Sequence, residues 1–290
     1  MPKNKIGLLA SFLTIAVALT LSALPARAAL QSVNVPNATE TDCNDINTAN
    51  IVVGFFIDTG GVSHGFVLIN KKFTTVDVPG STATLLYGIN NKNEAVGWYT
   101  DSSGVTHGMI VNSKLKVTTI DPPGAATTNA WSINDAGEVV GAYIDSGGVY
   151  HGFTLVGSTY TTFDAPNGSI LTEFTGINNK GVKVGIFDDS TGVEHGFALV
   201  GTTFTQIDDP NADGVTTATD RVNDSDEYVG LWGTNTAGPF SGYHAKNNVF
   251  TTITFPGSFE TRTRGINNAG IVVGRYTDQS GVIHGYAGTP

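Results

Sequence analysis

The sequence predicts an all-β fold, a six-bladed β-propeller with four antiparallel strands in each blade. Three observations carry this prediction. One motif recurs six times at spacings of 43 to 45 residues. Each repeat divides into four short segments rich in β-branched and aromatic residues. The segment ahead of the first repeat also resembles the fourth strand that the last repeat lacks. A period of about 40 to 50 residues with four strands is typical of propeller blades.

An Ile/Val–Asn pair fixes the register of the repeats. A Thr precedes the Asn by six residues, and a Gly follows it by seven. The six asparagines are Asn47, Asn90, Asn134, Asn178, Asn223 and Asn267. The repeats predict a single domain, residues 29–290, with units near 38–80, 81–124, 125–167, 168–211, 212–257 and 258–290 plus 29–37.

Each repeat is expected to form four strands in a fixed order. The first is exemplified by residues 84–90, the second by 95–100, the third by 151–156 and the fourth by 73–79. Asn, Asp and Gly cluster between these segments, as tight turns require. No segment after the first 28 residues has helical periodicity.

The N-terminal segment is expected to close the ring. Residues 30–36 align with the fourth strand at 73–79, whereas the last repeat stops after its third strand. Val33 is therefore predicted to pair with the last blade, which would protect sheet edges that an open array exposes. An open solenoid of the same units is the alternative, and it leaves residues 30–36 without a partner.

The first 28 residues are predicted to be a cleaved signal peptide. Lys3 and Lys5 precede an apolar run, and 26–28 read Ala-Arg-Ala, a small-x-small cleavage site. A membrane anchor is the alternative, but the run is short for a spanning helix. We expect a secreted or periplasmic protein that does not insert into the membrane.

The mature chain is expected to be strongly acidic. Without residues 1–28 it keeps 12 basic and 25 acidic residues, a net charge near −13. Such a charge disfavours binding to nucleic acid. The single cysteine, Cys43, excludes an internal disulfide and is expected to be buried in a strand.

The repeat unit resembles a known family. It reads Gly-Ile-Asn-Asn, Val-Gly, Asp, Gly, His-Gly-Phe and Phe-Thr-Thr-Ile-Asp-x-Pro-Gly in order, which is similar to the HAF-type extracellular repeats of bacterial secreted proteins. The family is named after a His-Ala-Phe triplet, which here is mostly His-Gly-Phe. The resemblance covers almost the whole mature chain and implies an exported repeat protein. It transfers no activity and no catalytic residue.

The repeated histidines and aspartates are interpreted as scaffold. The histidines lie on the third strand of each blade, roughly 10 Å outside the first strand at about 4.8 Å per strand, so they cannot converge on one site. Each is expected to bond a backbone group or the repeated Thr. The aspartates precede Gly-containing turns and are expected to cap them. The histidines are His64, His107, His151, His195 and His284; the aspartates are Asp58, Asp101, Asp145, Asp189 and Asp278.

Candidate ligand-binding residues lie where the repeat varies. The positions three and five residues before each Asn change from repeat to repeat, and alternation places both on one side of the first strand. If that strand lines a central channel, these side chains surround its mouth. Aromatic faces with carboxylates and arginines suit sugar-like ligands. The predicted set is Tyr87, Trp131, Glu173, Asp220, Arg262, Arg264 and Asp42. The alternative is that they only pack between unequal blades.

One loop resembles a calcium-binding loop. Residues 209–220 place Asp209, Asn211 and Asp213 at positions one, three and five, followed by a Gly. Position twelve is Asp220 rather than the usual Glu. The sequence therefore leaves two interpretations open, an ordinary loop, which we favour, and a Ca²⁺ site.

Two functions remain open from the sequence. The first is a secreted, monomeric binding protein that recognises a small molecule, a glycan or a surface protein, without catalysis. The second is an exported hydrolase or lyase acting on glycans or lactone-like substrates through carboxylates at the channel mouth. No nucleophile elbow, phosphate loop or zinc spacing is present, so no catalytic residue is assigned.

Overall fold

The computed structural model describes residues 29–290, and the predicted signal peptide, residues 1–28, lies outside them. The described chain forms twenty-four strands, β1–β24, and one short 3-10 turn, η1 (Pro210–Ala212). The prediction of an all-β fold is confirmed. Cys43 is free and fully buried on the first strand of the first repeat, as expected.

The strands pair in successive antiparallel sets of four, one set for each repeat. The first three sets are β2 (Glu40–Ile46), β3 (Val52–Ile57), β4 (Ser63–Ile69) and β5 (Lys72–Val76); β6 (Ala83–Ile89), β7 (Ala95–Thr100), β8 (Thr106–Val111) and β9 (Val117–Ile120); and β10 (Ala125–Ile133), β11 (Val139–Asp145), β12 (Tyr150–Val156) and β13 (Thr159–Phe163).

The next two sets are β14 (Leu171–Ile177), β15 (Lys183–Asp188), β16 (Glu194–Val200) and β17 (Thr203–Ile207); and β18 (Thr216–Val222), β19 (Tyr228–Gly233), β20 (Ser241–Lys246) and β21 (Val249–Ile253). The last set is β22 (Glu260–Ile266), β23 (Val272–Thr277), β24 (Ile283–Gly288) and β1 (Gln31–Val33). The strand bounds agree with those expected from the repeat to within a few residues.

The N-terminal strand lies against the last repeat. β1 pairs antiparallel with β24, and Val33 stands opposite Gly285. Asn34 follows directly, and its Oδ1 lies 3.2 Å from Nδ1 of His284. The segment that sequence alignment matched to a fourth strand therefore occupies the position of a fourth strand.

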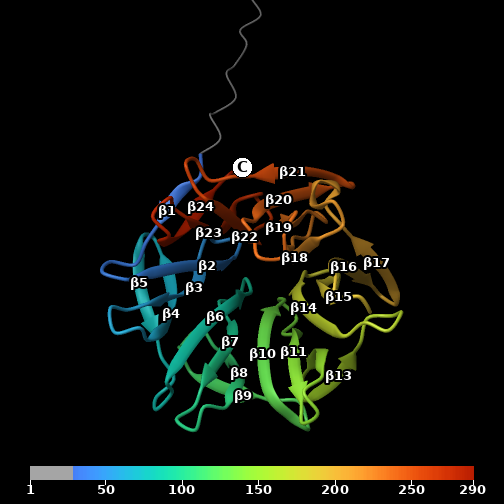
Figure 1. Ribbon diagram of the computed structural model, residues 1–290. Coiled ribbons are helices and arrows are strands. Elements are labelled where there is room, and N and C mark those ends of the chain that lie inside the picture. The colour runs from blue at the N-terminus through green and yellow to red at the C-terminus, as the bar shows by residue number, and fades with distance from the viewer. Residues whose placement is uncertain (1–28) are drawn as a thin grey trace, which may run out of the picture.

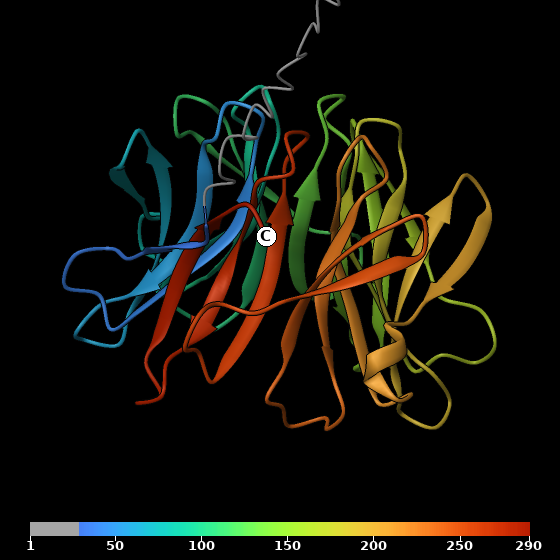
Figure 2. The ribbon, with the colours of Figure 1, turned by 90° about the horizontal axis from the view of Figure 1, so that it is seen from above.

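The first strands of the six sets surround a common axis. Each packs against the first strands of the sets before and after it, and β22 packs against β2 as well as β18. In Figure 1 these strands lie at the centre while the fourth strands lie at the rim, and Figure 2 shows the sets side by side from above.

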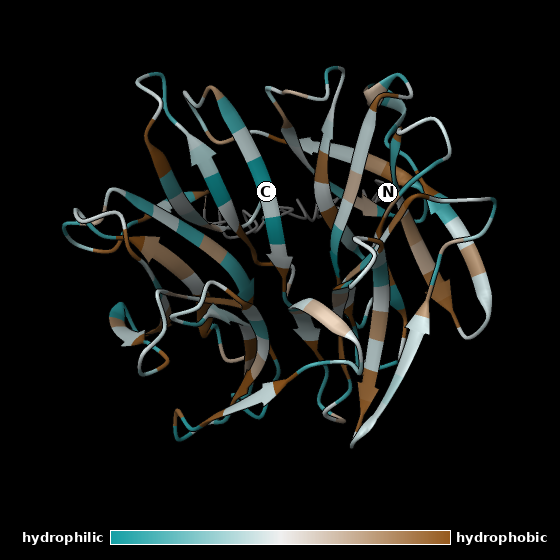
Figure 3. Ribbon diagram, turned by 60° about the horizontal axis from the view of Figure 1, so that its bottom comes forward, coloured by the Kyte–Doolittle hydropathy of each residue, from teal (hydrophilic) through white to brown (hydrophobic). Residues whose placement is uncertain are grey.

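The hydrophobic core lies between adjacent sets. In one cluster Val53 of β3 packs with Leu86 of β6 and Met109 of β8, and all three are fully buried. Figure 3 shows brown residues alternating with paler ones along the strands. Since each core layer is shared by two repeats, one repeat cannot bury its apolar face alone.

A β-bulge interrupts every first strand, and it changes one expectation. In β10 the register shifts between Ala130 and Ser132, so Trp131 is the extra residue. Ala130 and Ile133 then both reach the core although they are three residues apart. Strict alternation is therefore wrong at this point, because a bulge re-aims the side chains around it. Three positions per strand turn away from the core, rather than the two expected.

The repeated Thr fastens the loop that enters each first strand. The Oγ1 of Thr172 accepts a hydrogen bond of 2.9 Å from the backbone N–H of Ala165, and both residues are buried. Four other repeats have the same bond. In the third repeat the donor position is Pro122, which has no N–H, and Oγ1 of Thr128 is left without a partner.

This difference predicts unequal effects of one substitution. We expect Thr172→Val to lower the free energy of unfolding by about 1–2 kcal/mol, because it leaves the buried Ala165 N–H unsatisfied. Thr128→Val removes a hydroxyl that bonds nothing and should change stability by less than about 0.5 kcal/mol. Denaturant unfolding of both variants measures the difference. Equal losses would contradict the assigned role of the Thr.

Candidate functional site

The largest cleft near the axis gathers most of the predicted ligand-binding residues. It has a volume of about 350 Å³ and opens beside the first halves of β14, β18 and β22. Five of the seven predicted residues line it: Trp131, Glu173, Asp220, Arg262 and Arg264. The variable positions of four different repeats thus converge on one concave surface.

The other two predicted residues lie outside the lining of this cleft. Tyr87 stacks on Trp98 with ring centroids 3.9 Å apart and meets Trp131 edge-on at 4.6 Å. It therefore supports the Trp131 indole from behind. Oδ2 of Asp42 lies 3.4 Å from Nη1 of Arg275. Tyr87 thus packs against other aromatic rings and Asp42 forms an ion pair, and neither residue lines the cleft.

The divergent fifth repeat supplies a wall that the sequence did not predict. The connection between β19 and β20 is longer than its counterparts, and its residues Thr236 and Phe240 line the cleft. The Phe240 N–H donates to Glu260, and the Arg262 guanidinium lies 4.5 Å above the Phe240 ring. The sequence does contain a signal that this repeat differs, because the repeat lacks the His-Gly-Phe triplet.

Carboxyl groups dominate the electrostatics of the cleft. Asp188 and Glu194 join Glu173 and Asp220 in its lining. Burial, reinforced by the neighbouring carboxylates, raises the pKa of Glu173 to about 7 and that of Glu194 to about 7. Burial also raises the pKa of Asp220, while Arg264, 3.2 Å away, opposes the change. The cleft therefore holds groups that exchange protons near neutral pH.

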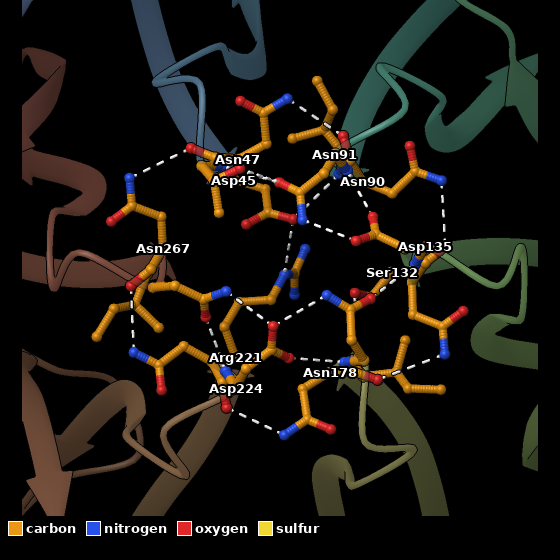
Figure 4. A pocket seen from close by; sticks show the side chains of 18 of the residues that line it. Asp45, Asn47, Asn90, Asn91, Ser132, Asp135, Asn178, Arg221, Asp224 and Asn267 are labelled. Carbon is orange, nitrogen blue, oxygen red and sulfur yellow. Dashed lines mark hydrogen bonds and ion pairs between the residues drawn. The ribbon is translucent and has the colours of Figure 1, made fainter.

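A second, smaller pocket lies at the opposite ends of the first strands. It has a volume of about 60 Å³ and is lined by the repeated Ile-Asn segments. Each repeated Asn donates its side-chain amide to the backbone carbonyl of the next one, and Asn267 donates back to Asn47. Figure 4 shows these amides surrounding the axis. The repeated asparagines are thus scaffold that links neighbouring repeats.

Arg221 occupies the axis between the two pockets, and the sequence did not single it out. Its guanidinium donates to the backbone carbonyls of Tyr87, Trp131, Thr175 and Asp220. Its Nε lies 3.5 Å from Oδ2 of Asp45 (Figure 4). Three repeats have Gly at this position, whereas the other three have Asp45, Ser132 or Arg221. That variation was a usable signal, but only the positions three and five residues before the Asn were considered.

The repeated histidines have partners other than those expected. Nδ1 of His107 lies 2.8 Å from Oδ2 of Asp121, and its Nε2 lies 3.4 Å from Oδ2 of Asp101. The expected bonds to backbone or Thr are wrong, because the fourth strand brings a second Asp beside the ring. The turn-capping role of Asp101 is confirmed, since its Oδ1 accepts from the N–H groups of Ser103 and Val105.

These His–Asp contacts predict a pH dependence of stability. The hydrogen bond to Asp121 raises the pKa of His107, so this contribution is complete below about pH 6.5 and is lost as the pH rises through the folded value. The bond from Ser103 lowers the pKa of Asp101 to about 2, so that contribution is lost as the pH falls below about 4. We expect the melting temperature difference between the wild type and His107→Gln to be largest near pH 5–6. A difference that is constant from pH 5 to 9 would contradict this.

Residues of the predicted calcium loop form hydrogen bonds and an ion pair with other residues of the chain. Asp209 caps η1, and its Oδ1 accepts from the backbone and side chain of Asn211. Asp220 lies on β18 and pairs with Arg264. Asp213 forms the left-handed end of the turn. Within residues 29–290, no three His, Cys, Asp or Glu side chains gather as metal ligands do. Both interpretations of the sequence, the ordinary loop that we favour and the Ca²⁺ site, stay predictions.

Calcium binding is tested directly by thermal unfolding. Because Asp209 caps η1 while Asp220 pairs with Arg264 on β18, we expect millimolar Ca²⁺ to shift the melting temperature of the mature protein by less than about 1 °C. A tightly bound ion would raise it by several degrees, since ligands of the folded state stabilise it. Such a rise would establish the calcium site.

The comparisons with known proteins identify the fold class. No protein-family model matches the chain, and no curated protein matches it. Several solved β-propellers and related structures are similar. A putative TolB from Agrobacterium tumefaciens is 11% identical, with 91% of this chain and 99% of that chain covered and a TM-score of 0.59. AofleA from Arthrobotrys oligospora is 10% identical, with coverage of 89% and 86% and a TM-score of 0.57.

A third similar structure is the fungal lectin of Aleuria aurantia, a six-bladed β-propeller that recognises fucose. It is 8% identical, covers 89% of this chain and 93% of its own, and has a TM-score of 0.53. At such identities these likenesses concern the fold alone. The chain has a β-propeller fold, and its resemblance to HAF-type repeats stays a resemblance. Across residues 29–290, no helix is long and apolar enough to span a membrane.

Proposed function

We propose that this protein is a binding β-propeller that takes a polar, glycan-like ligand in the cleft lined by Trp131 and Glu173. The single observation that carries the proposal is the composition of that cleft. An indole, several carboxyl groups and two guanidinium groups line about 350 Å³ of concave space. Sugars are bound by such combinations of an aromatic face and convergent polar groups.

The surrounding structure supports this role. Trp131 is held edge-on by Tyr87 and Trp98 at 4.6 and 4.9 Å, so its ring is fixed before a ligand arrives. The longer connection of the fifth repeat adds Phe240 to the wall. The similar fungal lectin is said to recognise fucose, which illustrates that a propeller of this kind can bind a sugar.

A titration of purified mature protein with a panel of oligosaccharides tests the proposal. We expect at least one neutral or charged oligosaccharide to bind, and Trp131→Ala to weaken it at least tenfold. Trp232→Ala is the matched control, because Trp232 lies on β19 outside the cleft lining. Absence of binding by every oligosaccharide, or equal losses in both variants, would refute the glycan cleft.

The second candidate is an exported hydrolase or lyase. It is favoured by the pKa of about 7 that burial and neighbouring carboxylates give to both Glu173 and Glu194, since general acids and bases work best near the ambient pH. Turnover of glycan or lactone substrates that is lost in Glu173→Gln or Glu194→Gln would favour the enzyme. Tight binding without turnover would favour the binding protein.

We further infer that the propeller is a closed six-bladed ring in one domain. Two observations support closure: the pairing of Val33 with Gly285, and the cycle of amide bonds that returns from Asn267 to Asn47. Removal of residues 29–37 should then lower the melting temperature sharply, because β24 loses its pairing with β1.

We also propose that the protein is exported as a soluble monomer, because residues 1–28 have the features of a cleaved signal peptide. Cell fractionation with N-terminal sequencing tests this, with the mature chain expected to start near Ala29. Sedimentation of the purified chain tests the monomer.

A further inference from the structure

The ligand that the cleft selects depends on which of its charged groups are already paired. Both arginines have carboxylate partners. Nη1 of Arg264 lies 3.2 Å from Oδ1 of Asp220, and Nε of Arg262 lies 2.6 Å from Oε1 of Glu260. Arg262 also stacks over Phe240. Each guanidinium therefore has part of its charge offset by a carboxylate of the chain itself.

Three carboxyl groups of the cleft are not paired in this way. Glu173 on β14, Asp188 on β15 and Glu194 on β16 all line the cleft, and none forms an ion pair with another side chain of the described chain. β15 brings Asp188 directly opposite Glu194 in the sheet. The cleft thus presents acidic groups from three adjacent strands of one blade, and none of the three is in an ion pair among the described residues.

A fourth carboxyl group is only half satisfied. Asp220 lines the same cleft and is 5% exposed. One of its oxygens receives the bond from Arg264, while Oδ2 has no hydrogen-bond partner. A buried carboxylate oxygen without a donor is costly. Among the described residues, no donor satisfies this buried oxygen in the lining of the cleft.

We propose that the sugar bound in this cleft is an amino sugar in its protonated form. The proposal rests on the glycan-binding function proposed above. The ammonium group contacts the carboxyl groups of Glu173, Glu194 and Asp188, and the sugar ring lies against Trp131. An ammonium group supplies three donors and a positive charge, which the carboxyl cluster lacks. An acidic sugar would face the same carboxylates and be repelled.

The protonation of the cleft follows from this arrangement. Glu173 faces Glu194, Asp188 and Asp220, and Glu194 also faces Arg262 and Arg264. In the free protein burial and this repulsion raise the pKa of both glutamates to about 7. A bound cation favours the ionised form and lowers both values. Binding near pH 7 must therefore release protons from the protein.

Calorimetric titration with a glucosamine tetramer tests the proposal at pH 7. Its N-acetylated counterpart and a galacturonate tetramer are the comparison ligands. We expect the amino form to bind at least tenfold more tightly than the N-acetylated form, and the galacturonate not to bind. Titrations in two buffers with different heats of ionisation should show net proton release on binding the amino form.

Variants locate the effect in the cleft. Glu173→Gln and Glu194→Gln should each weaken binding of the glucosamine tetramer at least tenfold, without lowering the melting temperature, because each removes a repelling charge. Asp226→Asn is the matched control. Its carboxylate pairs with Lys180 at the other end of the axis, and both side chains are half-exposed, so binding should be unchanged.

The possible failures are distinguishable. If the N-acetylated or galacturonate tetramer binds as tightly as the amino form, and binding depends on Trp131, the amino-sugar inference is overturned while the glycan cleft stands. If no oligosaccharide binds, both proposals fail. Proton uptake, or no proton exchange, on binding the amino form also overturns the inference.

Discussion

Replacement of Arg221 by Met should lower the free energy of unfolding by about 3–5 kcal/mol, the range measured when one partner of a buried charge pair is removed. The side chain is 5% exposed. Met fills most of its volume but donates nothing to the carbonyls of Tyr87, Trp131 and Thr175, which point at the axis. The Asp45 carboxyl also loses its cationic partner among residues 29–290.

Two further variants separate the causes. Asp45→Asn combined with Arg221→Met should recover at least about 1 kcal/mol, because the buried acid is removed with its partner. Arg221→Lys should fall between the wild type and Arg221→Met, since an ammonium group cannot reach carbonyls on several sides as a planar guanidinium does. Chemical denaturation measures all three. An Arg221→Met protein as stable as the wild type would show that Arg221 does not hold the axis together.

Replacement of Gly97 by Ala should cost about 3 kcal/mol or more, the upper range for overpacking a rigid site. A Cβ at this position would stand 2.0 Å from the carbonyl oxygen of Leu85 in the adjacent first strand. The obstacle is backbone within a paired sheet, so it cannot rotate away. All six repeats have a Gly here, and each would meet a carbonyl oxygen at 1.9–2.1 Å.

Gly104→Ala is the matched control for this prediction. Gly104 has a φ of +88° and no atom within 4 Å of its added Cβ. Only backbone strain opposes Ala there, at about 1–2 kcal/mol. Thermal unfolding compares the two variants, and soluble yield is compared if Gly97→Ala does not fold. Similar stability of the two variants would refute the close approach as the reason for Gly97.

Much of the fold could be predicted from the sequence, because its strands and turns depend on nearby residues and recur in every repeat. The Asp101 turn cap depends on residues two and four positions away, and the Val33 pairing was visible as an alignment of residues 30–36 with 73–79. Comparison of the repeats also singled out Trp131, Glu173 and Arg264, because they lie at positions where the residue type changes from repeat to repeat. Five of the seven residues chosen in this way line one cleft.

Other features depended on contacts that the folded chain makes between separate strands and loops. The second Asp beside His107 comes from the neighbouring fourth strand, thirteen or fourteen residues further along. Oγ1 of Thr128 has no partner because a proline stands at the donor position in the loop before it. The proline is present in the sequence, but its effect can be recognised only once the equivalent bond of Thr172 is known. Each of these outcomes depends on which backbone groups tertiary pairing brings into reach.

The sequence by itself determined the all-β class, the four-strand unit, the position of the N-terminal strand and most of the variable residues that gather near the axis, because periodicity and turn residues act over short distances. Only the tertiary structure decided which variable side chains share a cleft and that Arg221 fills the axis. It also decided that burial beside other carboxyl groups raises the pKa of Glu173 and of Glu194. A bulge in every first strand turns a third position away from the core. Burial and repulsion then depend on distances between blades, which no single repeat encodes.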